Sequence, residues 1–210
     1  KSWNYNNVLP YFKKSESIEG LDETYRNKSG PLKLSRSSEG NELSKVYLEA
    51  AEQAGYEINN DMNGYKQEGF GLMDTTIYGG RRQSTSVTYL HPVINRRNLT
   101  VITNTIVNKV IIENNKAIGV ECTAGREIKK IYADNEVILS AGAINSPQLL
   151  MLSGIGSAEE LKKLDISVQH DLRGVGENLQ DHLETYLQYE CTKPVTLYTS
   201  YNPIRMAFIG

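Results

Sequence analysis

The sequence is poor in cysteine, has little charge excess and contains no long apolar run. Only two cysteines occur, Cys122 and Cys191, and neither has a partner at metal-ligand spacing, which argues against a disulfide framework and a zinc site. The formal net charge is −2 and no basic cluster is interleaved with aromatic residues, so nucleic acid is an unfavourable partner. No apolar run approaches the roughly 20 residues that cross a bilayer, and no signal peptide opens the chain.

What is present is typical of a folded, soluble protein. The 210 residues are 39% hydrophobic and 23% charged, which is enough for one large domain or two small ones. Both ends look interrupted, because Lys1 is not a methionine and the chain stops within the apolar stretch 206–210. We therefore expect an interior segment of a longer protein.

The spacing of apolar residues predicts helices and a β-rich centre. Helices are predicted over 8–16, over 42–54 with Gly55 as the C-cap, and from Ser157 through 164, where Ser157 and Glu160 form a capping box. Strands are predicted over 72–78, 99–103, 106–113, 117–122, 127–132, 136–139, 166–170 and 183–190. A tight turn at Asn114-Asn115 favours an antiparallel meander.

The most informative stretch is 142–156, GAINSPQLLMLSGIG, which directly follows the apolar run 137–139. It predicts a buried strand, a turn of small residues at 141–143, and a helix with Pro147 in its first position. Such a junction leaves backbone N–H groups free at a helix N-terminus, where an adenosine or a phosphate could rest. A tight turn alone would also explain the first small residues. A turn does not require the second small-residue cluster, 153–156, and this favours a nucleotide site.

Two other stretches carry candidate chemistry. The glycine-rich segment 174–179 lacks the third glycine of a dinucleotide loop, and no strand-loop-helix unit surrounds it, so we exclude it as a phosphate loop. If 183–190 is a strand, His182, Glu184 and Tyr186 share one face. A carboxylate beside an aromatic ring can hold a quaternary ammonium group, which has no N–H donor. The alternative is an ordinary solvated strand face.

The stretch 142–156 fills every specified position of the second signature of the glucose-methanol-choline (GMC) family of FAD-dependent oxidoreductases, and the chain resembles that family throughout. Further blocks occur in the family's order at 8–16, 61–71, 80–85, 98–101 and 174–184. The blocks DMNGYKQEGFG and GVGENLQDHLETYLQYEC most resemble the choline-oxidising members.

The resemblance implies a fold and a set of site residues. It implies an α/β (α+β) fold, with a mixed segment over 1–97, part of the FAD-binding domain over 98–181, and the start of an antiparallel-sheet substrate domain over 182–210. It places the backbone of Val107 at the adenine of FAD and places Ala141 and Gly142 beside the adenosine half. It places Glu184 at the trimethylammonium group of choline and His182 near the flavin. The family's glycine loop and catalytic histidine lie outside this segment, so no catalytic residue is expected in it.

The resemblance also implies an activity. The expected reaction is oxidation of choline to betaine aldehyde with hydride transfer to flavin N5, and a quinone or oxygen as the electron acceptor. The alternatives are another alcohol or sugar oxidoreductase of the family and a non-catalytic nucleotide-binding module. No metal is expected. We expect a cytoplasmic location, with peripheral association at the inner membrane as an alternative for the longer protein. Made alone, the chain is expected to expose apolar surface around 137–139.

Overall fold

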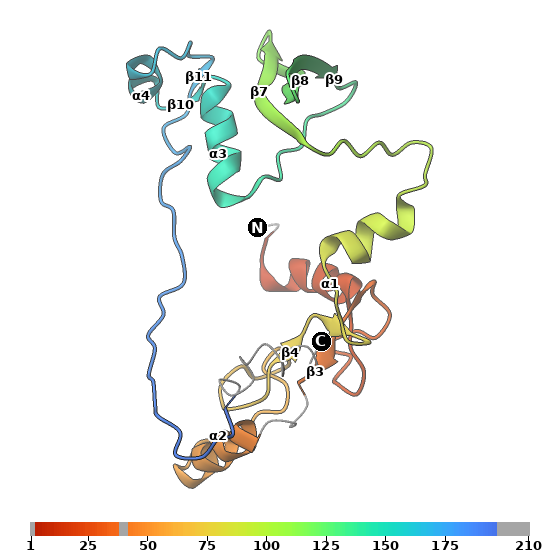
Figure 1. The fold of residues 1–210 in the computed structure, drawn as a ribbon, viewed down its shortest axis with the longest axis vertical. Coiled ribbons are helices and arrows are strands. Elements are labelled where there is room, and N and C mark those ends of the chain that lie inside the picture. Colours follow the sequence, from red (N-terminus) through yellow and green to blue (C-terminus); the bar gives the residue numbers. More distant parts are fainter. Residues whose placement is uncertain (1–2, 38–41, 197–210) are drawn as a thin grey trace. The chain divides into compact units, whose positions relative to one another are not determined.

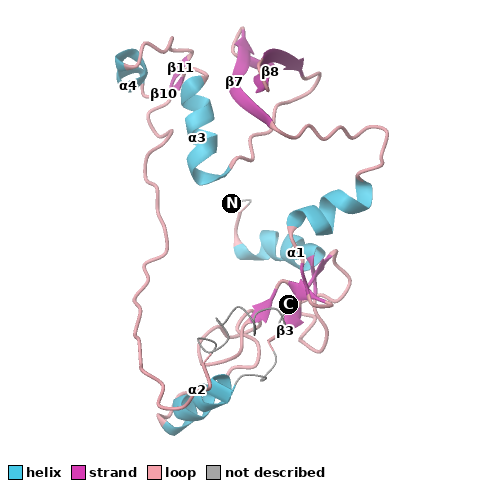
Figure 2. Cartoon of the chain, in the orientation of Figure 1, coloured by secondary structure: helices cyan, strands magenta, loops and turns pink. Residues whose placement is uncertain are grey.

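The computed structural model describes residues 3–37 and 42–196, which divide into two units (Figures 1 and 2). The first unit comprises Lys1–Thr100 and Gln188–Gly210, and the second comprises Val101–Leu187. The first unit contains two α-helices, each followed by short strands, whereas the second combines an antiparallel meander with two helices. The mixed α/β (α+β) class expected from the sequence is confirmed. The domain boundaries predicted near residues 97 and 181 stay predictions.

The first unit begins with a helix that is longer than its apolar spacing predicts. Helix α1 (Tyr5–Ser15) starts directly after Asn4, whose side chain accepts the N–H of Asn7 at 3.0 Å, so an N-cap sets the start rather than the first apolar residue. Helix α2 (Glu42–Gln53) matches its prediction, and Gly55 follows with a φ of +85°.

The strands of the first unit are short. They are β1 (Glu16–Ser17), β2 (Leu32–Lys33), β3 (Ser35–Arg36), β4 (Asp74–Thr75), β5 (Ile77–Tyr78) and β6 (Arg81–Arg82). β1 and β2 pair in parallel, whereas β3 pairs with β4 and β5 with β6 in antiparallel fashion. The strand predicted over 72–78 is thus divided between β4 and β5, because its two halves pair with different partners. A π-helical turn, η1 (Ser86–Leu90), and a 3₁₀ turn, η2 (His91–Val93), follow.

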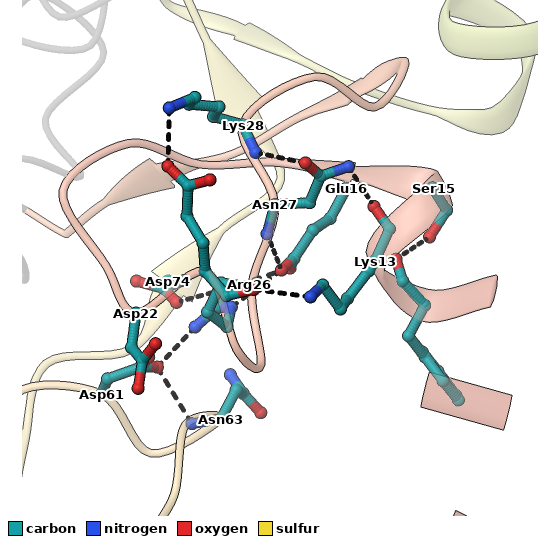
Figure 3. A network of polar contacts seen from close by, with 12 residues as sticks. Lys13, Ser15, Glu16, Asp22, Arg26, Asn27, Lys28, Asp61, Asn63 and Asp74 are labelled. Carbon is teal, nitrogen blue, oxygen red and sulfur yellow. Dashed lines mark hydrogen bonds and ion pairs between the residues drawn. The ribbon is translucent and has the colours of Figure 1, made fainter. Parts of the chain in front are cut away.

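A buried arginine organises the polar interior of the first unit (Figure 3). The Arg26 side chain is only 3% exposed, and its guanidinium binds Glu16 at 2.9 Å, Asp61 at 2.5 Å and Asp74 at 3.0 Å. Burial opposes the charge on Arg26, but the hydrogen bonds to Glu16 and Asp74 and the nearby carboxylates outweigh burial and raise its pKa. The cation is therefore permanent, and it joins three segments that are distant in the sequence.

Residues 61–71, one of the blocks that resemble the family, make packing contacts within the same unit. The ring of Phe70 lies 5.4 Å from that of Tyr47 on α2 and 5.0 Å from that of Tyr56. A Cβ at Gly71 would come within 2.1 Å of the backbone oxygen of Asn59, so only glycine fits there. Together with the Asp61–Arg26 ion pair, these contacts give the segment 61–71 a structural role.

The second unit contains the meander that the sequence predicts. Strands β7 (Thr105–Glu113), β8 (Lys116–Ala124) and β9 (Glu127–Tyr132) pair in that order, all antiparallel. Asn114 and Asn115 have φ values of +49° and +60°, as a two-residue hairpin turn of the primed type requires. Val110 and Cys122 are the buried apolar residues of this sheet among the described residues. The strands predicted over 106–113, 117–122 and 127–132 are confirmed.

Helix α3 (Gly142–Leu152) packs against β7 and is followed by β10 (Ile155–Gly156), α4 (Ala158–Lys163) and β11 (His170–Asp171). β10 and β11 pair in parallel, so only the end of the predicted strand 166–170 forms. Pro147 lies inside α3 and not at its first position, because the helix already begins at Gly142. The predicted capping box is wrong in its bonds: Ser157 is the N-cap, but its side chain makes no capping bond, and Asp171 accepts the N–H of Ala158 at 2.9 Å instead.

Three predicted strands do not form in the described chain. Residues 99–103, 136–139 and 183–190 have no ladder partner, and without one an apolar or alternating run remains irregular. The buried strand predicted at 137–139 is therefore wrong for this chain, where Ile138 is 74% exposed. The absence of a strand at 183–190 removes the strand face that the sequence assigned to His182 and Glu184.

The exposure of large apolar side chains carries a prediction for the chain made alone. In the second unit, Ile106, Ile138, Ile144 and Leu152 are all exposed, and an exposed apolar patch of this kind favours association. We expect the isolated 210-residue chain to bind the dye ANS strongly and to sediment as more than a monomer. A monomeric product with a sharp thermal transition and no ANS binding would contradict this.

Candidate functional site

A cavity lies in the second unit where the meander meets α3. Its volume is about 560 Å³, within the roughly 300–1,000 Å³ typical of small-molecule sites. Aliphatic side chains from β7, β8, the segment 137–141 and α3 form most of its wall, and the amides of Asn145 and Gln148 provide polar groups. A cavity of this kind accepts a flat apolar ring that carries a few polar edges.

Two of the predicted cofactor residues meet in this cavity. Val107, on β7, and Ala141, directly before α3, both line it although they are distant in the sequence. Gly142 opens α3 with a φ of +92°, and a Cβ built on it would meet no atom within 4 Å. The backbone is therefore open to a ligand at this point, and the first N–H groups of α3 lack carbonyl partners within the helix.

The chemistry of this site fits the adenosine half of FAD. An adenine ring needs an apolar wall, which Val107, Val120 and Leu149 provide. A ribose or phosphate needs N–H or amide donors and close backbone approach, which the start of α3 provides. Ala141 is already held at this junction, because its N–H donates to the Ser146 hydroxyl at 3.0 Å.

The predicted substrate residues lie in an extended segment without strand pairing. The Tyr186 hydroxyl donates to a carboxylate oxygen of Glu184 at 2.5 Å, so these two side chains are in contact although no strand places them on one face. This hydrogen bond raises the pKa of Tyr186, because it stabilises the protonated phenol that donates it. His182 is held only through its backbone, whose N–H donates to Asp181 at 2.8 Å, and in the described chain no hydrogen bond joins it to Glu184.

The sequence did not single out Ser153, which the structure places next to the cavity. Its hydroxyl bridges α3 and β7. The only signal was its place in the second small-residue cluster, 153–156, whose purpose the turn chemistry left unexplained. Within residues 3–37 and 42–196, no group of three or more His, Cys, Asp or Glu side chains is arranged to hold a metal, and no helix is long and apolar enough to span a membrane.

The chain is similar in sequence to choline dehydrogenases along its whole length. It is 50% identical over all 210 residues to the mitochondrial choline dehydrogenase of Homo sapiens, of which it covers 35%. It is 48% identical over the same 210 residues to the oxygen-dependent choline dehydrogenase of Brucella anthropi, of which it covers 38%. The chain thus spans little more than a third of the length of these relatives.

Solved structures share its fold. An FAD-dependent oxidoreductase from Chaetomium thermophilum matches with a TM-score of 0.81 and 30% identity, over 86% of this chain and 34% of that one. Pyridoxine 4-oxidase from Mesorbium loti matches with a TM-score of 0.75 and 28% identity, over 81% of this chain and 34% of that one. The family model described as GMC oxidoreductase matches residues 1–184. The resemblance noted in the sequence is confirmed, and the chain belongs to the GMC oxidoreductase family.

Proposed function

We propose that the protein containing this chain is an FAD-dependent choline dehydrogenase that oxidises choline to betaine aldehyde. The observation that carries the proposal is the 48–50% identity to choline dehydrogenases across all 210 residues. The pair of Glu184 and Tyr186 supports it, since a carboxylate beside an aromatic ring suits a cation that cannot donate a hydrogen bond.

In this proposal the chain binds and orients, and the reacting groups come from elsewhere. Val107, Ala141 and Gly142 hold the adenosine half of FAD at the cavity between β7 and α3. Glu184 attracts the trimethylammonium group, and His182 lies near the flavin. When bound, FAD supplies the flavin N5 that accepts the hydride from the alcohol carbon. The electron acceptor is a quinone or oxygen, and the name of the Brucella anthropi relative specifies oxygen.

The alternative within the family is a different alcohol or sugar substrate. The solved neighbours include pyridoxine 4-oxidase, so similar chains act on other substrates, but that neighbour is 28% identical whereas the choline dehydrogenases are 48–50% identical. A non-catalytic nucleotide-binding module is the alternative of another class. We also propose a cytoplasmic location, or peripheral attachment at the inner membrane; cell fractionation tests it, and a mitochondrial location like that named for the human relative would contradict it.

The test is to express the full-length protein and titrate it with choline without oxygen. We expect a yellow protein whose flavin absorbance bleaches on addition of choline and does not bleach with glucose. A yellow protein that another alcohol bleaches and choline does not would support the alternative substrate. A folded protein that binds no flavin would contradict the enzyme function itself.

A further inference from the structure

Ser153 ends α3 with a hydroxyl that bonds in two directions. It is 7% exposed. The Ser153 hydroxyl accepts a hydrogen bond from the backbone N–H of Val110 at 2.8 Å. The same hydroxyl donates a hydrogen bond to the carbonyl of Leu149 at 2.6 Å. The hydroxyl therefore connects the last turn of α3 to β7 through buried hydrogen bonds.

The N–H that Ser153 accepts lies on the free edge of the meander. Among the described strands β7 lies at the edge of the meander, where one side of its backbone has no strand partner, so a buried N–H on that side needs another acceptor. β7 is also irregular, because its register with β8 shifts between Val107 and Lys109. The bond from Val110 fixes the strand directly after this bulge, close to where Val107 faces the cavity.

The other partner of Ser153 belongs to the opposite wall of the same cavity. Leu149 and Leu152, on the last turn of α3, line the cavity together with Val107 and Ala141. One hydroxyl thus ties the helical wall to the strand wall. The cavity depends on the distance between these walls, because Val107 is on one and Ala141 begins the other.

Gly154, the residue after Ser153, connects the end of α3 to a second segment. Gly154 has a φ of +85°, and a Cβ there would come within 2.4 Å of the backbone oxygen of Ser167. Its carbonyl accepts the N–H groups of Gln169 at 2.8 Å and His170 at 3.1 Å. The helix end is therefore anchored on both sides, and the Ser153 hydroxyl adds a direct hydrogen bond to β7 at Val110.

We propose that Ser153 is a positioning residue for the adenosine site, because it sets the spacing between the Val107 wall and the α3 wall. This rests on the proposed binding of FAD. The residue touches neither the reacting atoms nor the substrate, so its loss weakens binding of the adenosine half and leaves the chemical step unchanged.

The test compares Ser153→Ala with Ser157→Ala in the full-length enzyme. Ser157 is a serine close to Ser153 in the sequence, but its side chain makes no capping hydrogen bond, so its replacement by alanine is the matched control. We expect Ser153→Ala to raise the Kd of the apoprotein for FAD about tenfold and that for ADP by the same factor, with kcat and the KM for choline unchanged at saturating FAD. Ser157→Ala should change neither Kd more than twofold.

Equal Kd values for Ser153→Ala and wild type would overturn the positioning role. A roughly tenfold loss of kcat at saturating FAD, as large as the rise in Kd, would also overturn it. If Ser153→Ala does not fold, Ser153→Cys, which keeps the volume and weakens the hydrogen bonds, takes the same measurements with the same expected direction. Failure of the wild-type protein to bind FAD and ADP would instead overturn the proposed function. The wild-type measurement comes first, so this outcome is distinguished from an effect of the variants.

Discussion

Replacing Arg26 with methionine is expected to lower the local stability of the first unit by about 3–5 kcal/mol, because removing one partner from a buried ionic cluster leaves the others uncompensated. Methionine fills much of the space of the arginine stem but leaves Glu16, Asp61 and Asp74 without their common cation. Asp61 and Asp74 each have one buried oxygen without a hydrogen-bond partner, and Arg36, whose Nε lies 3.7 Å from Asp74, can offset the loss only at that carboxylate.

The measurement is hydrogen exchange by mass spectrometry in the full-length protein, read in peptides covering 16–28 and 57–75. The matched control is Lys28→Met, which removes the exposed pair with Glu23 and should leave exchange in these peptides nearly unchanged, because an exposed ion pair contributes little to stability. Arg26→Lys should retain only part of the stability, because an ammonium cannot bind three carboxylates with the geometry of a guanidinium. Equal protection in Arg26→Met and Lys28→Met would show that the cluster contributes little.

Replacing Glu184 with glutamine is expected to raise the KM for choline about 10- to 100-fold, because in the proposed site the change removes the full charge that attracts the trimethylammonium group. The shape of the side chain is kept, and the remaining amide oxygen can still accept the Tyr186 hydroxyl that now bonds to the carboxylate. The loss therefore reports charge rather than position. Steady-state kinetics of the full-length enzyme measure it.

The control for this prediction is an uncharged substrate of the same shape. In 3,3-dimethylbutan-1-ol a carbon replaces the choline nitrogen, so the cation is absent while the bulk remains. Its KM should be similar for wild type and Glu184→Gln. An unchanged KM for choline in the variant would exclude Glu184 as the ammonium site, and an equal rise for both substrates would indicate a general distortion of the pocket.

Local patterns predicted the elements whose bonds are local. The meander of β7, β8 and β9 follows from β-rich runs and the Asn114-Asn115 turn, and α2 follows from its apolar spacing and Gly55. The segments 137–139 and 183–190 have equally suitable patterns and yet form no strand. A strand needs a partner as well as a pattern, and the described chain contains none for either segment.

The candidate site was predictable in part. The family resemblance led to Val107 and Ala141, and the structure brings both into one cavity, although their contact with FAD stays a prediction. The Arg26 cluster and the Ser153 bridge were not predictable, because each joins residues at separations that no periodicity covers. Arg26 binds partners 10, 35 and 48 residues away, and Ser153 binds Val110 from 43 residues away.

The long separations around Arg26 have a consequence for synthesis on the ribosome. The chain grows from its N-terminus, so Arg26 and Glu16 leave the exit tunnel before Asp61 and Asp74, the last of which follows Arg26 by 48 residues. Until that carboxylate emerges, burying the guanidinium would leave its charge only partly neutralised. We therefore expect Arg26 to stay in water until β4 has been translated, and the Arg26 cluster to form only then.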